Sequence, residues 1–372
     1  MSDDPTNQPK VRYAVVGAGW IAQQAFMPGV AQTGNSVLAG LVTGDPEKGR
    51  ALAAKYGIAH VCGYDGYDAL LRSGAIDAVY IATPNTLHRD HAVPALEAGI
   101  HVLCEKPLAD SEESAQAMID AARAGGAKLM VGYRLHFEPA TVEALELVHS
   151  GRIGEVRLFN CTFTQQVAAA NHRAKAGYWA DPVADMGPYP INMARHVFQA
   201  DPVEVMALSS RGDERRFGTV PESVSVLMRF PGDRMAQFVV SYGADALDAY
   251  RIVGTEGNLH AEPGFDFMAP LQFRLTTASG TEERRFPHTD QFGGELRHFS
   301  ACILEGREPQ PDGEEGLADV RAVLAIQDSL RTGRPVAVEP VRRPRTPQPD
   351  QVATLPFVME PDLVNAAPPS GD

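Results

Sequence analysis

The segment VRYAVVGAGWIA at residues 11–22 decides the fold, because a valine-rich apolar run leads directly into the spacing G-x-G-x-x-A. The apolar run suits an inner parallel strand, and a helical pattern over residues 21–32 begins inside the motif. Such glycines allow a tight turn and let a pyrophosphate approach the backbone, although glycines also serve ordinary turns. In this strand–helix context the spacing predicts a dinucleotide site. We expect its contacts at Gly17, Gly19, Trp20 and Ile21.

The end of the second predicted strand, Val37–Val42, indicates which nucleotide is bound. An acidic residue at this point usually holds the ribose of NAD, but here Thr43 stands at the tip and Asp45 follows two residues later. Asp45 has a structural explanation, because it can cap a helix whose first position is Pro46. The Thr43 hydroxyl and the Lys48 ammonium would then meet a 2′-phosphate, whereas the alternative for Lys48 is a solvated helix charge. We predict NADP, with NAD as the alternative.

A later apolar run, His101–Cys104, ends in Glu105-Lys106-Pro107. Proline has no N–H and restricts the residue before it, so the strand must stop there. The carboxyl ends of strands in an open α/β sheet are where ligands bind, although a surface loop with an ordinary ion pair is the alternative. The preceding strand pattern, Ala78–Ala82, ends in a similar way at Thr83-Pro84-Asn85.

Strand and helix patterns alternate up to about residue 150 and then change. The alternation predicts a parallel sheet covered on both faces. Within it, Asp110 and Glu113 are typical of a capping box that begins a helix over Ser111–Ala124. Beyond Gly151 strand patterns follow one another, which predicts a mostly antiparallel open sheet. These strands are Val156–Thr164, Val203–Ser209, Ser223–Phe230, Met235–Ser241, Ala249–Val253 and Leu271–Thr276.

The expected fold class is α/β, with a doubly wound nucleotide-binding domain followed by an α+β domain. We place a disordered N-terminus at residues 1–9, the first domain at 10–135, the second at 136–338 and a Pro-rich arm or tail at 339–372. The C-terminal helical patterns, over 294–304 and 315–331, are candidates to pack back on the first domain.

Composition excludes several classes of partner. The 372 residues carry a formal net charge of -14, so nucleic acid and anionic membrane surfaces are not expected partners. No run of about 18 apolar residues occurs, and the four cysteines are widely separated, which fits a cytoplasmic protein without disulfides. His88 and His91 share a helix face but lack a third ligand, so we expect surface or capping histidines and no metal site.

A second candidate site spans residues 184–195. Tyr189 and Asn192 are three residues apart and can share a helix face, as can Asn192 and Arg195. Asp185 lies one turn earlier, where the alternative is a helix N-cap. The alternative for Tyr189 is a core aromatic residue with a satisfied hydroxyl.

Taken together, these motifs resemble the glucose–fructose oxidoreductase/inositol dehydrogenase (Gfo/Idh/MocA) family over about residues 10–338. The tyrosine branch is the nearest, which includes glucose–fructose oxidoreductase and NADP-dependent xylose dehydrogenase, because inositol dehydrogenases carry histidine in place of Tyr189 and aspartate in place of Asn192. A glycine-rich run normally precedes Asp185, but here it reads Asp181-Pro182-Val183. The motifs that carry the resemblance are Gly17–Ala22, Glu105–Pro107, Gly132–Arg134, Asp185–Arg195, Gly313–Gly316 and Arg331–Pro335.

The resemblance implies a Rossmann domain, a nicotinamide cofactor, and a sugar, polyol or cyclic diol as substrate. In this branch the residues that match Thr43 and Lys48 contact the 2′-phosphate of NADP. It also implies a homodimer or homotetramer built on the open sheet, and the C-terminal tail is a candidate to reach a neighbouring subunit. We expect further cofactor contacts from Thr83, Pro84, Asn85, His88, Glu105, Lys106 and Arg134.

Hydride leaves a carbinol carbon only as its hydroxyl loses a proton, so a positioned base is required. We assign Tyr189 as this proton carrier, and Lys106 as the group that binds the reacting oxygen and stabilises the phenolate; the two roles are exchangeable at this point. Glu105 is expected to hold Lys106, and Asp185 to orient substrate or tyrosine. The substrate residues expected are Lys106, Arg134, Arg173, Asp185 and Tyr189, although surface charges are the alternative for the two arginines.

An NADP-binding sensor or scaffold with weak or no catalysis is the alternative function. The Lys106 and Tyr189 pair argues against it, because a sensor has no use for a proton relay. An enzyme that keeps its cofactor between turnovers and one that releases it are both compatible with the sequence.

Overall fold

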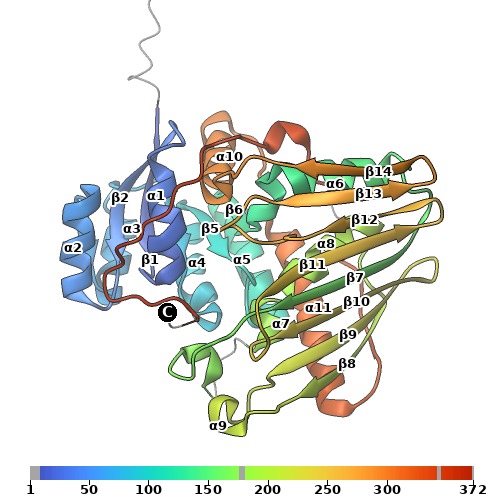
Figure 1. Cartoon of the computed structure of the whole chain (residues 1–372). Coiled ribbons are helices and arrows are strands. Elements are labelled where there is room, and N and C mark those ends of the chain that lie inside the picture. The colour runs from blue at the N-terminus through green and yellow to red at the C-terminus, as the bar shows by residue number, and fades with distance from the viewer. Residues whose placement is uncertain (1–8, 176–180, 342–344, 371–372) are drawn as a thin grey trace, which may run out of the picture.

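The structure is a computed structural model that describes residues 9–175, 181–341 and 345–370. It contains two sheets placed side by side, with helices between and around them (Figure 1). The expectation for residues 1–9 falls, apart from Pro9, outside the described residues. The predicted fold class is confirmed: a parallel sheet precedes a mostly antiparallel one.

The first sheet has six parallel strands in the order β3-β2-β1-β4-β5-β6. The order reverses beside β1, which places the carboxyl ends of β1, β4 and β5 around one crevice. Helices cover both faces, as predicted. The strands are β1 (Val11–Val16), β2 (Ser36–Val42), β3 (His60–Cys62), β4 (Ala78–Ile81), β5 (His101–Glu105) and β6 (Leu129–Gly132). The helices are α1 (Met27–Val30), α2 (Pro46–Tyr56), α3 (Tyr67–Leu71), α4 (His88–Glu97) and α5 (Glu112–Gly125).

Helix α5 begins one residue later than the predicted capping box. The Ser111 hydroxyl, not the Asp110 carboxylate, accepts from the backbone N–H of Ser114, at 3.1 Å. Serine and aspartate both serve as caps, so two adjacent candidates could not be ranked from composition alone. Helix α1 is preceded by a π-helical turn, Ala22–Phe26, which the regular helical pattern did not predict.

The second sheet has nine strands in the order β14-β13-β12-β11-β7-β10-β9-β8-β15. Only the β7–β10 pair is parallel. β12, β14 and β15 were not predicted, because β12 and β14 are short hairpin partners that contain polar residues and β15 has only two residues. The strands are β7 (Val156–Thr164), β8 (Glu204–Ser210), β9 (Ser223–Phe230), β10 (Arg234–Ser241), β11 (Leu247–Gly254), β12 (Gly257–Ala261), β13 (Gln272–Thr277), β14 (Gly280–Arg285) and β15 (Val336–Ala337).

One face of this sheet is covered and the other is open. In β9 the buried residues alternate with exposed ones, as an antiparallel strand with one solvated face requires. The helices lie on the side that faces the first domain (Figure 1). They are α6 (Pro139–His149), α7 (Pro182–Asp185), α8 (Pro188–Phe198) and α11 (Gly313–Thr332), with α9 (Glu214–Phe217) at the edge.

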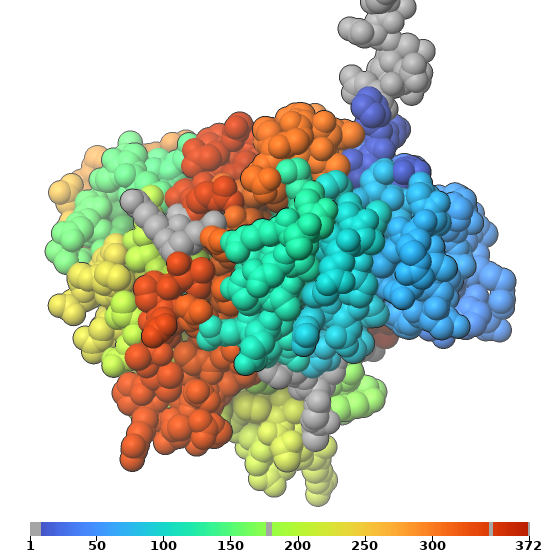
Figure 2. Space-filling model, turned by 180° about the vertical axis from the view of Figure 1, so that it is seen from behind, coloured from blue at the N-terminus to red at the C-terminus, as the bar shows by residue number. Residues whose placement is uncertain are grey.

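The chain returns to the first domain at its C-terminal end. Helix α10 (Gln291–Glu305) buries Leu296 and Phe299 in the core around Tyr13, and α11 adds Leu317 and Val320 to the core around β5 and β6. From behind, the orange and red C-terminal elements lie directly against the first domain (Figure 2). The described part of the tail then crosses the first domain of its own chain (Figure 1). Contact between the tail and a neighbouring subunit stays a prediction.

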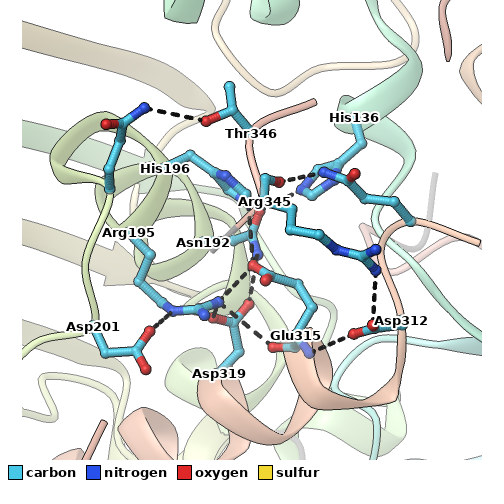
Figure 3. A network of polar contacts seen from close by, with 12 residues as sticks. His136, Asn192, Arg195, His196, Asp201, Asp312, Glu315, Asp319, Arg345 and Thr346 are labelled. Atoms are coloured by element: carbon cyan, nitrogen blue, oxygen red, sulfur yellow. Dashed lines mark hydrogen bonds and ion pairs between the residues drawn. The ribbon is translucent and has the colours of Figure 1, made fainter. Parts of the chain in front are cut away.

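A buried polar network joins α8 to α11 and fixes the orientation of α8 (Figure 3). Arg195, completely buried, donates to Asp201, Glu315 and Asp319, each at 2.7 Å. Asn192, one turn earlier, donates to Asp319 at 2.9 Å and pairs with His136 at 2.8 Å. Because His136 directly follows the first sheet, in the turn Arg134–Phe137, the network also ties α8 to the first domain.

The charges in this network are interdependent. Burial opposes ionisation of Glu315, but Arg195 and His196 outweigh it and hold the pKa of Glu315 well below its usual range. Burial raises the pKa of Asp319, and the negative charge of Glu315 adds to that increase. Burial also lowers the pKa of His136 to about 3, so this ring is neutral. The positive charge of Arg195 is therefore the main interaction that favours the ionised form of these carboxylates.

We predict that Arg195→Met destabilises the protein by about 3–5 kcal/mol at pH 7, because it leaves buried carboxylates without their cation. In this variant the pKa values of the buried carboxyl groups should rise in the folded state. The folded variant is then most stable below the ordinary pKa of a carboxyl, where these groups are protonated, and it loses stability as the pH increases. Urea unfolding should show a smaller loss at pH 5 than at pH 7. Arg331→Met, at a side chain 72% exposed, should cost less than about 1 kcal/mol. Equal losses for the two variants would contradict this assignment.

Candidate functional site

A cavity of about 1040 Å³ lies where the carboxyl ends of the first sheet face the second domain. This volume is at the upper end of the range typical of ligand pockets. Every predicted site residue except Gly17 and Thr43 lines it, so the structure brings together residues from both candidate motifs. The second domain contributes Phe163, Asp248 and Phe265 among others.

The turn after β1 is shaped for a dinucleotide. Gly17 has φ +92°, and a Cβ there would lie 2.9 Å from backbone atoms of Ala82. A Cβ on Gly19 would meet nothing within 4 Å, which leaves the space that a pyrophosphate needs. Within the described part of the chain, the buried Trp20 Nε1 and Thr83 Oγ1 have no hydrogen-bond partner. The free space at Gly19 and these two unpaired polar atoms fit a nucleotide that lies between the turn and the end of β4.

At the end of β2, the predicted helix cap at Asp45 is confirmed. Asp45 caps α2 through one carboxylate oxygen, which accepts from the backbone N–H groups of Glu47 and Lys48 at 3.0 Å each. Lys48 lines the cavity. Thr43 is buried, and its hydroxyl oxygen accepts from the backbone N–H of Asp45 at 3.3 Å, which leaves its proton available to a ligand.

The expectation that His88 is a surface or capping histidine is wrong. It is 1% exposed, and its two ring nitrogens lie 3.0 Å from the carbonyl oxygens of Thr83 and Pro107. Burial lowers the pKa of His88 to about 4, so the ring is neutral. The ring therefore braces the loops after β4 and β5. A helix pattern could not reveal this, because the two loops meet only in the folded sheet.

Lys106 meets Asp185 across the boundary between the domains. Its ammonium donates to the carbonyl oxygen of Asp185 at 2.7 Å and to the carboxylate at 3.1 Å. Arg173 donates to the other carboxylate oxygen at 2.7 Å. Asp185 therefore joins two cations and does not cap α8, which excludes the N-cap alternative.

The electrostatics of this cluster keep Lys106 positively charged. Burial favours the neutral amine, but the negative charges of Asp185, Tyr189 and Glu105 together outweigh it, so the pKa of Lys106 lies above its usual value. Burial equally opposes ionised Asp185, yet Arg173 and Lys106 hold its pKa well below the usual range. A lysine that stays protonated suits charge stabilisation better than proton abstraction.

Glu105 does not hold the Lys106 ammonium, contrary to expectation. One carboxylate oxygen accepts from the Tyr80 hydroxyl at 2.6 Å, and the other accepts from the backbone N–H of Lys106 at 3.3 Å. Burial raises the pKa of Glu105. The side chain thus fixes the end of β5, and Asp185 fixes the ammonium.

Tyr189 stands at the start of α8 with its ring between two cations. Lys106 Nζ lies 5.0 Å and the Arg134 guanidinium carbon 4.9 Å from the ring centroid, within the range of cation–π contacts. The ring packs edge-on against Phe163, with centroids 5.4 Å apart. Its hydroxyl makes no hydrogen bond to another residue in the described ranges, so the satisfied-hydroxyl alternative is not what the structure shows.

Arg134 is more buried than a surface charge would be, with 5% exposure. It donates to the Phe265 carbonyl oxygen at 2.6 Å and to the Gln291 side chain. The Arg134 guanidinium therefore packs against the Tyr189 ring and also lines the cavity.

Several cavity residues were not found from the sequence. Asp248 accepts the backbone N–H of Phe265 at 2.8 Å, and burial raises its pKa to about 6. Phe163 and Phe265 form an apolar wall beside Tyr189. Each comes from a strand or loop of the second sheet without a local motif, so no sequence signal marked it.

The departure at Asp181 has a structural consequence. Its carboxylate caps α7 by accepting from Val183 and Ala184, at 2.8 and 2.9 Å, and also accepts from Gln327 at 3.1 Å. A short capped helix therefore stands at the position where the family resemblance implies a glycine-rich run.

Two negative results concern the described residues. Within them, no group of three or more histidine, cysteine, aspartate or glutamate side chains is arranged to hold a metal. None of the helices in those ranges is both long and apolar enough to cross a membrane. The cysteines are free.

Comparison with known proteins shows the family to which both domains of the chain belong. A model described as an oxidoreductase family with an NAD-binding Rossmann fold matches residues 11–133, and the GFO/IDH/MocA C-terminal domain matches residues 141–260. The chain is 31% identical to a D-xylose 1-dehydrogenase (NADP+) of Haloarcula marismortui over 345 residues, which covers 90% of this chain and 94% of the relative.

Solved structures share the overall fold of this chain. An aldose-aldose oxidoreductase from Caulobacter crescentus, complexed with glycerol, has a TM-score of 0.83 at 34% identity and covers 88% of this chain and 100% of that one. A 3-ketoreductase from Actinomadura kijaniata, in complex with NADP and TDP-benzene, has a TM-score of 0.79 at 26% identity, with coverages of 86% and 98%. These matches extend over both domains, and the chain is a member of the GFO/IDH/MocA family of oxidoreductases.

Proposed function

We propose that this oxidoreductase uses NADP to transfer a hydride to or from a carbinol carbon of a sugar, polyol or cyclic diol. The observation that carries the proposal is the convergence of Lys106 and Tyr189 in one cavity that also contains the nucleotide turn. The relatives support the substrate class, because a xylose dehydrogenase, an aldose oxidoreductase and a 3-ketoreductase are among them.

The residues of the first domain fit the two ends of a dinucleotide. Gly19 and the N-terminal turn of the following helix would hold the pyrophosphate, and Thr43 with Lys48 would hold the 2′-phosphate. Thr83, Asn85 and the end of β5 would hold the nicotinamide half, whose ring supplies or accepts the hydride when bound.

The proton is assigned to Tyr189. In the oxidation direction its oxygen takes the proton of the substrate hydroxyl, and in reduction its hydroxyl returns that proton to the carbonyl oxygen. Lys106 stays cationic beside the reacting oxygen and stabilises the charge that develops there. Asp185 positions the ammonium and, with Arg173, forms the polar rim on which hydroxyl groups of the substrate would bind.

The selection of NADP is tested at Lys48. Lys48→Ala should weaken NADP binding about tenfold or more and NAD binding much less, because a charge-assisted phosphate contact contributes roughly 1.5–3 kcal/mol. Fluorescence titration with both reduced nucleotides measures the difference. Arg50→Ala removes an exposed cation of the same helix that does not line the cavity, and is the matched control. Equal weakening of both nucleotides by Lys48→Ala would refute the assignment.

The chemical step is tested by Tyr189→Phe, Lys106→Ala and the double variant. Each single change should slow hydride transfer by about 10²–10⁴-fold, and the double variant should lose much less than the product if both act on one proton transfer. Single-turnover kinetics with an aldose or polyol substrate gives the rates, and NADP binding should persist in Tyr189→Phe.

Tyr13→Phe is the control for this series, because its hydroxyl meets Ser300 in the core, away from the cavity. A near-normal rate in Tyr189→Phe with inactive Lys106→Ala would transfer the proton role to Lys106. Near-normal rates in both variants would contradict the proposed proton transfer by Lys106 and Tyr189.

The open face of the second sheet supports a homo-oligomer. Leu208 is 67% and Leu227 45% exposed on it, and Met235 and Leu158 lie on neighbouring strands. Exposed apolar residues grouped in this way mark interaction surfaces.

We expect a dimer or tetramer by light scattering at micromolar concentration, formed through this face. Replacing both Leu208 and Leu227 by Lys should dissociate it, since unpaired charges cannot be buried at the interface. Leu304→Lys, an exposed leucine of α10, should leave the assembly intact. A monomeric parent protein would overturn the proposal.

A further inference from the structure

The C-terminal tail is held on the first domain by specific contacts, and its last described residues reach the cavity. We call residues 355–370 the strap. The strap begins beside α10, where the Leu355 carbonyl oxygen accepts from the backbone N–H of Asp290 at 2.9 Å and Phe357 stacks on His288 with ring centroids 3.7 Å apart. It then crosses the helix that follows the nucleotide turn.

That helix is wound as a π-helix over Ala22–Phe26, where the strap docks. The carbonyl oxygen of Gln24 accepts from the backbone N–H of Glu360 at 3.0 Å. The side chain of Gln23 pairs with the backbone of Val364 in both directions, at 2.8 and 3.0 Å, and also donates to the carbonyl oxygen of Ala18 at 2.9 Å. Gln23 thus connects the strap directly to the nucleotide turn. Single π-turns inside helices occur frequently at functional sites.

Two further contacts join the strap to α2, and the second lies at the start of this helix, beside the expected 2′-phosphate position. Glu360 forms an ion pair with Lys55 of α2 at 2.7 Å. Asn365 donates to the Asp45 carboxylate at 2.9 Å, on the oxygen that Asp45 does not use to cap α2. Asn365 has φ +45°, a left-handed conformation that asparagine tolerates, and the chain turns here.

The strap then passes from the first domain to the second. Residues 365–369 line the cavity together with Lys48 and Trp20, and the Pro369 carbonyl oxygen accepts from the backbone N–H of Ala168 at 2.9 Å. Residues 363–370, LVNAAPPS, carry no carboxylate, although the chain has a net charge of -14. An uncharged segment is the kind that can lie beside bound phosphates without repulsion.

We propose that residues 364–370 belong to the nucleotide site as its removable outer wall, so that NADP enters and leaves only when they undock. The cavity keeps a volume of about 1040 Å³ with the strap in place, so the strap covers the space for a nucleotide and does not fill it. The inference rests on the proposed binding of NADP. It would make strap release the step that governs how long the cofactor is retained between turnovers.

The test is the rate of nucleotide exchange in the full-length chain and in a chain that ends at Leu363. Stopped-flow displacement of NADPH by excess NADP, followed by nicotinamide fluorescence, should show dissociation about tenfold or more faster in the shortened chain, because the enclosing contacts are lost. Association should be at least as fast. Asn365→Ala, which removes one anchor, should fall between the two, and Asn258→Ala on β12, away from the cavity, should match the parent chain.

A second measurement does not depend on a shortened chain. In the full-length protein, NADP should slow hydrogen exchange of the strap amides, including that of Val364, relative to the protein alone. Equal dissociation rates for the parent and shortened chains, or exchange at the strap unaffected by NADP, would overturn the proposal. Tighter NADPH binding in the shortened chain would also overturn it, since the strap would then be a competitor. If neither chain binds NADPH, the proposed function itself is contradicted, and the proposal for the strap falls with it.

Discussion

A buried guanidinium must be surrounded by anions, and much of this molecule is arranged to meet that requirement at Arg195. Its partners come from the loop after α8 and from α11, so the helix that carries Tyr189 cannot shift without leaving ionised groups unpaired in the core. Such a shift is costly, because the surrounding protein offers no water to replace the lost partners. Asn192 extends the same restraint to His136 and therefore to the first domain. Tyr189, the proposed proton carrier, is therefore positioned by a network of which it is not itself a member.

A second ionic junction, at Asp185, couples the two domains where chemistry is proposed. The carboxylate lies between Lys106 from the first sheet and Arg173 from the second domain. Its neighbours keep it ionised, and it keeps Lys106 protonated in return. This reciprocity favours one of two assignments that the sequence left open, in which lysine supplies charge and tyrosine carries the proton. It also means that the ammonium is oriented before any ligand arrives, as electrostatic preorganisation requires.

The parts of the site that could be predicted are those attached to a local backbone signal. The glycine spacing after β1, the proline after Lys106 and the cap at Asp45 each have a conformational cause that acts within a few residues, and the structure shows the corresponding turn, strand end and helix start. Errors arose where two local solutions were nearly equal, as for Asp110 and Ser111, or where a residue acts on a distant loop, as for His88. Asp248 and Phe265 carry no local signal, and only the packing of the second sheet against α8 places them in the cavity.

The sequence by itself determined the fold class and the nucleotide turn, because period, spacing and backbone restriction are properties of neighbouring residues, and its family resemblance singled out Lys106 and Tyr189 as candidates. It did not determine which charges pair. The Lys106 ammonium lies on Asp185 and not on adjacent Glu105, and the Pro-rich tail lies across the first domain as a strap. Those outcomes were decided by the tertiary structure, since electrostatic pairing and desolvation depend on distances in space between residues that are far apart in the chain.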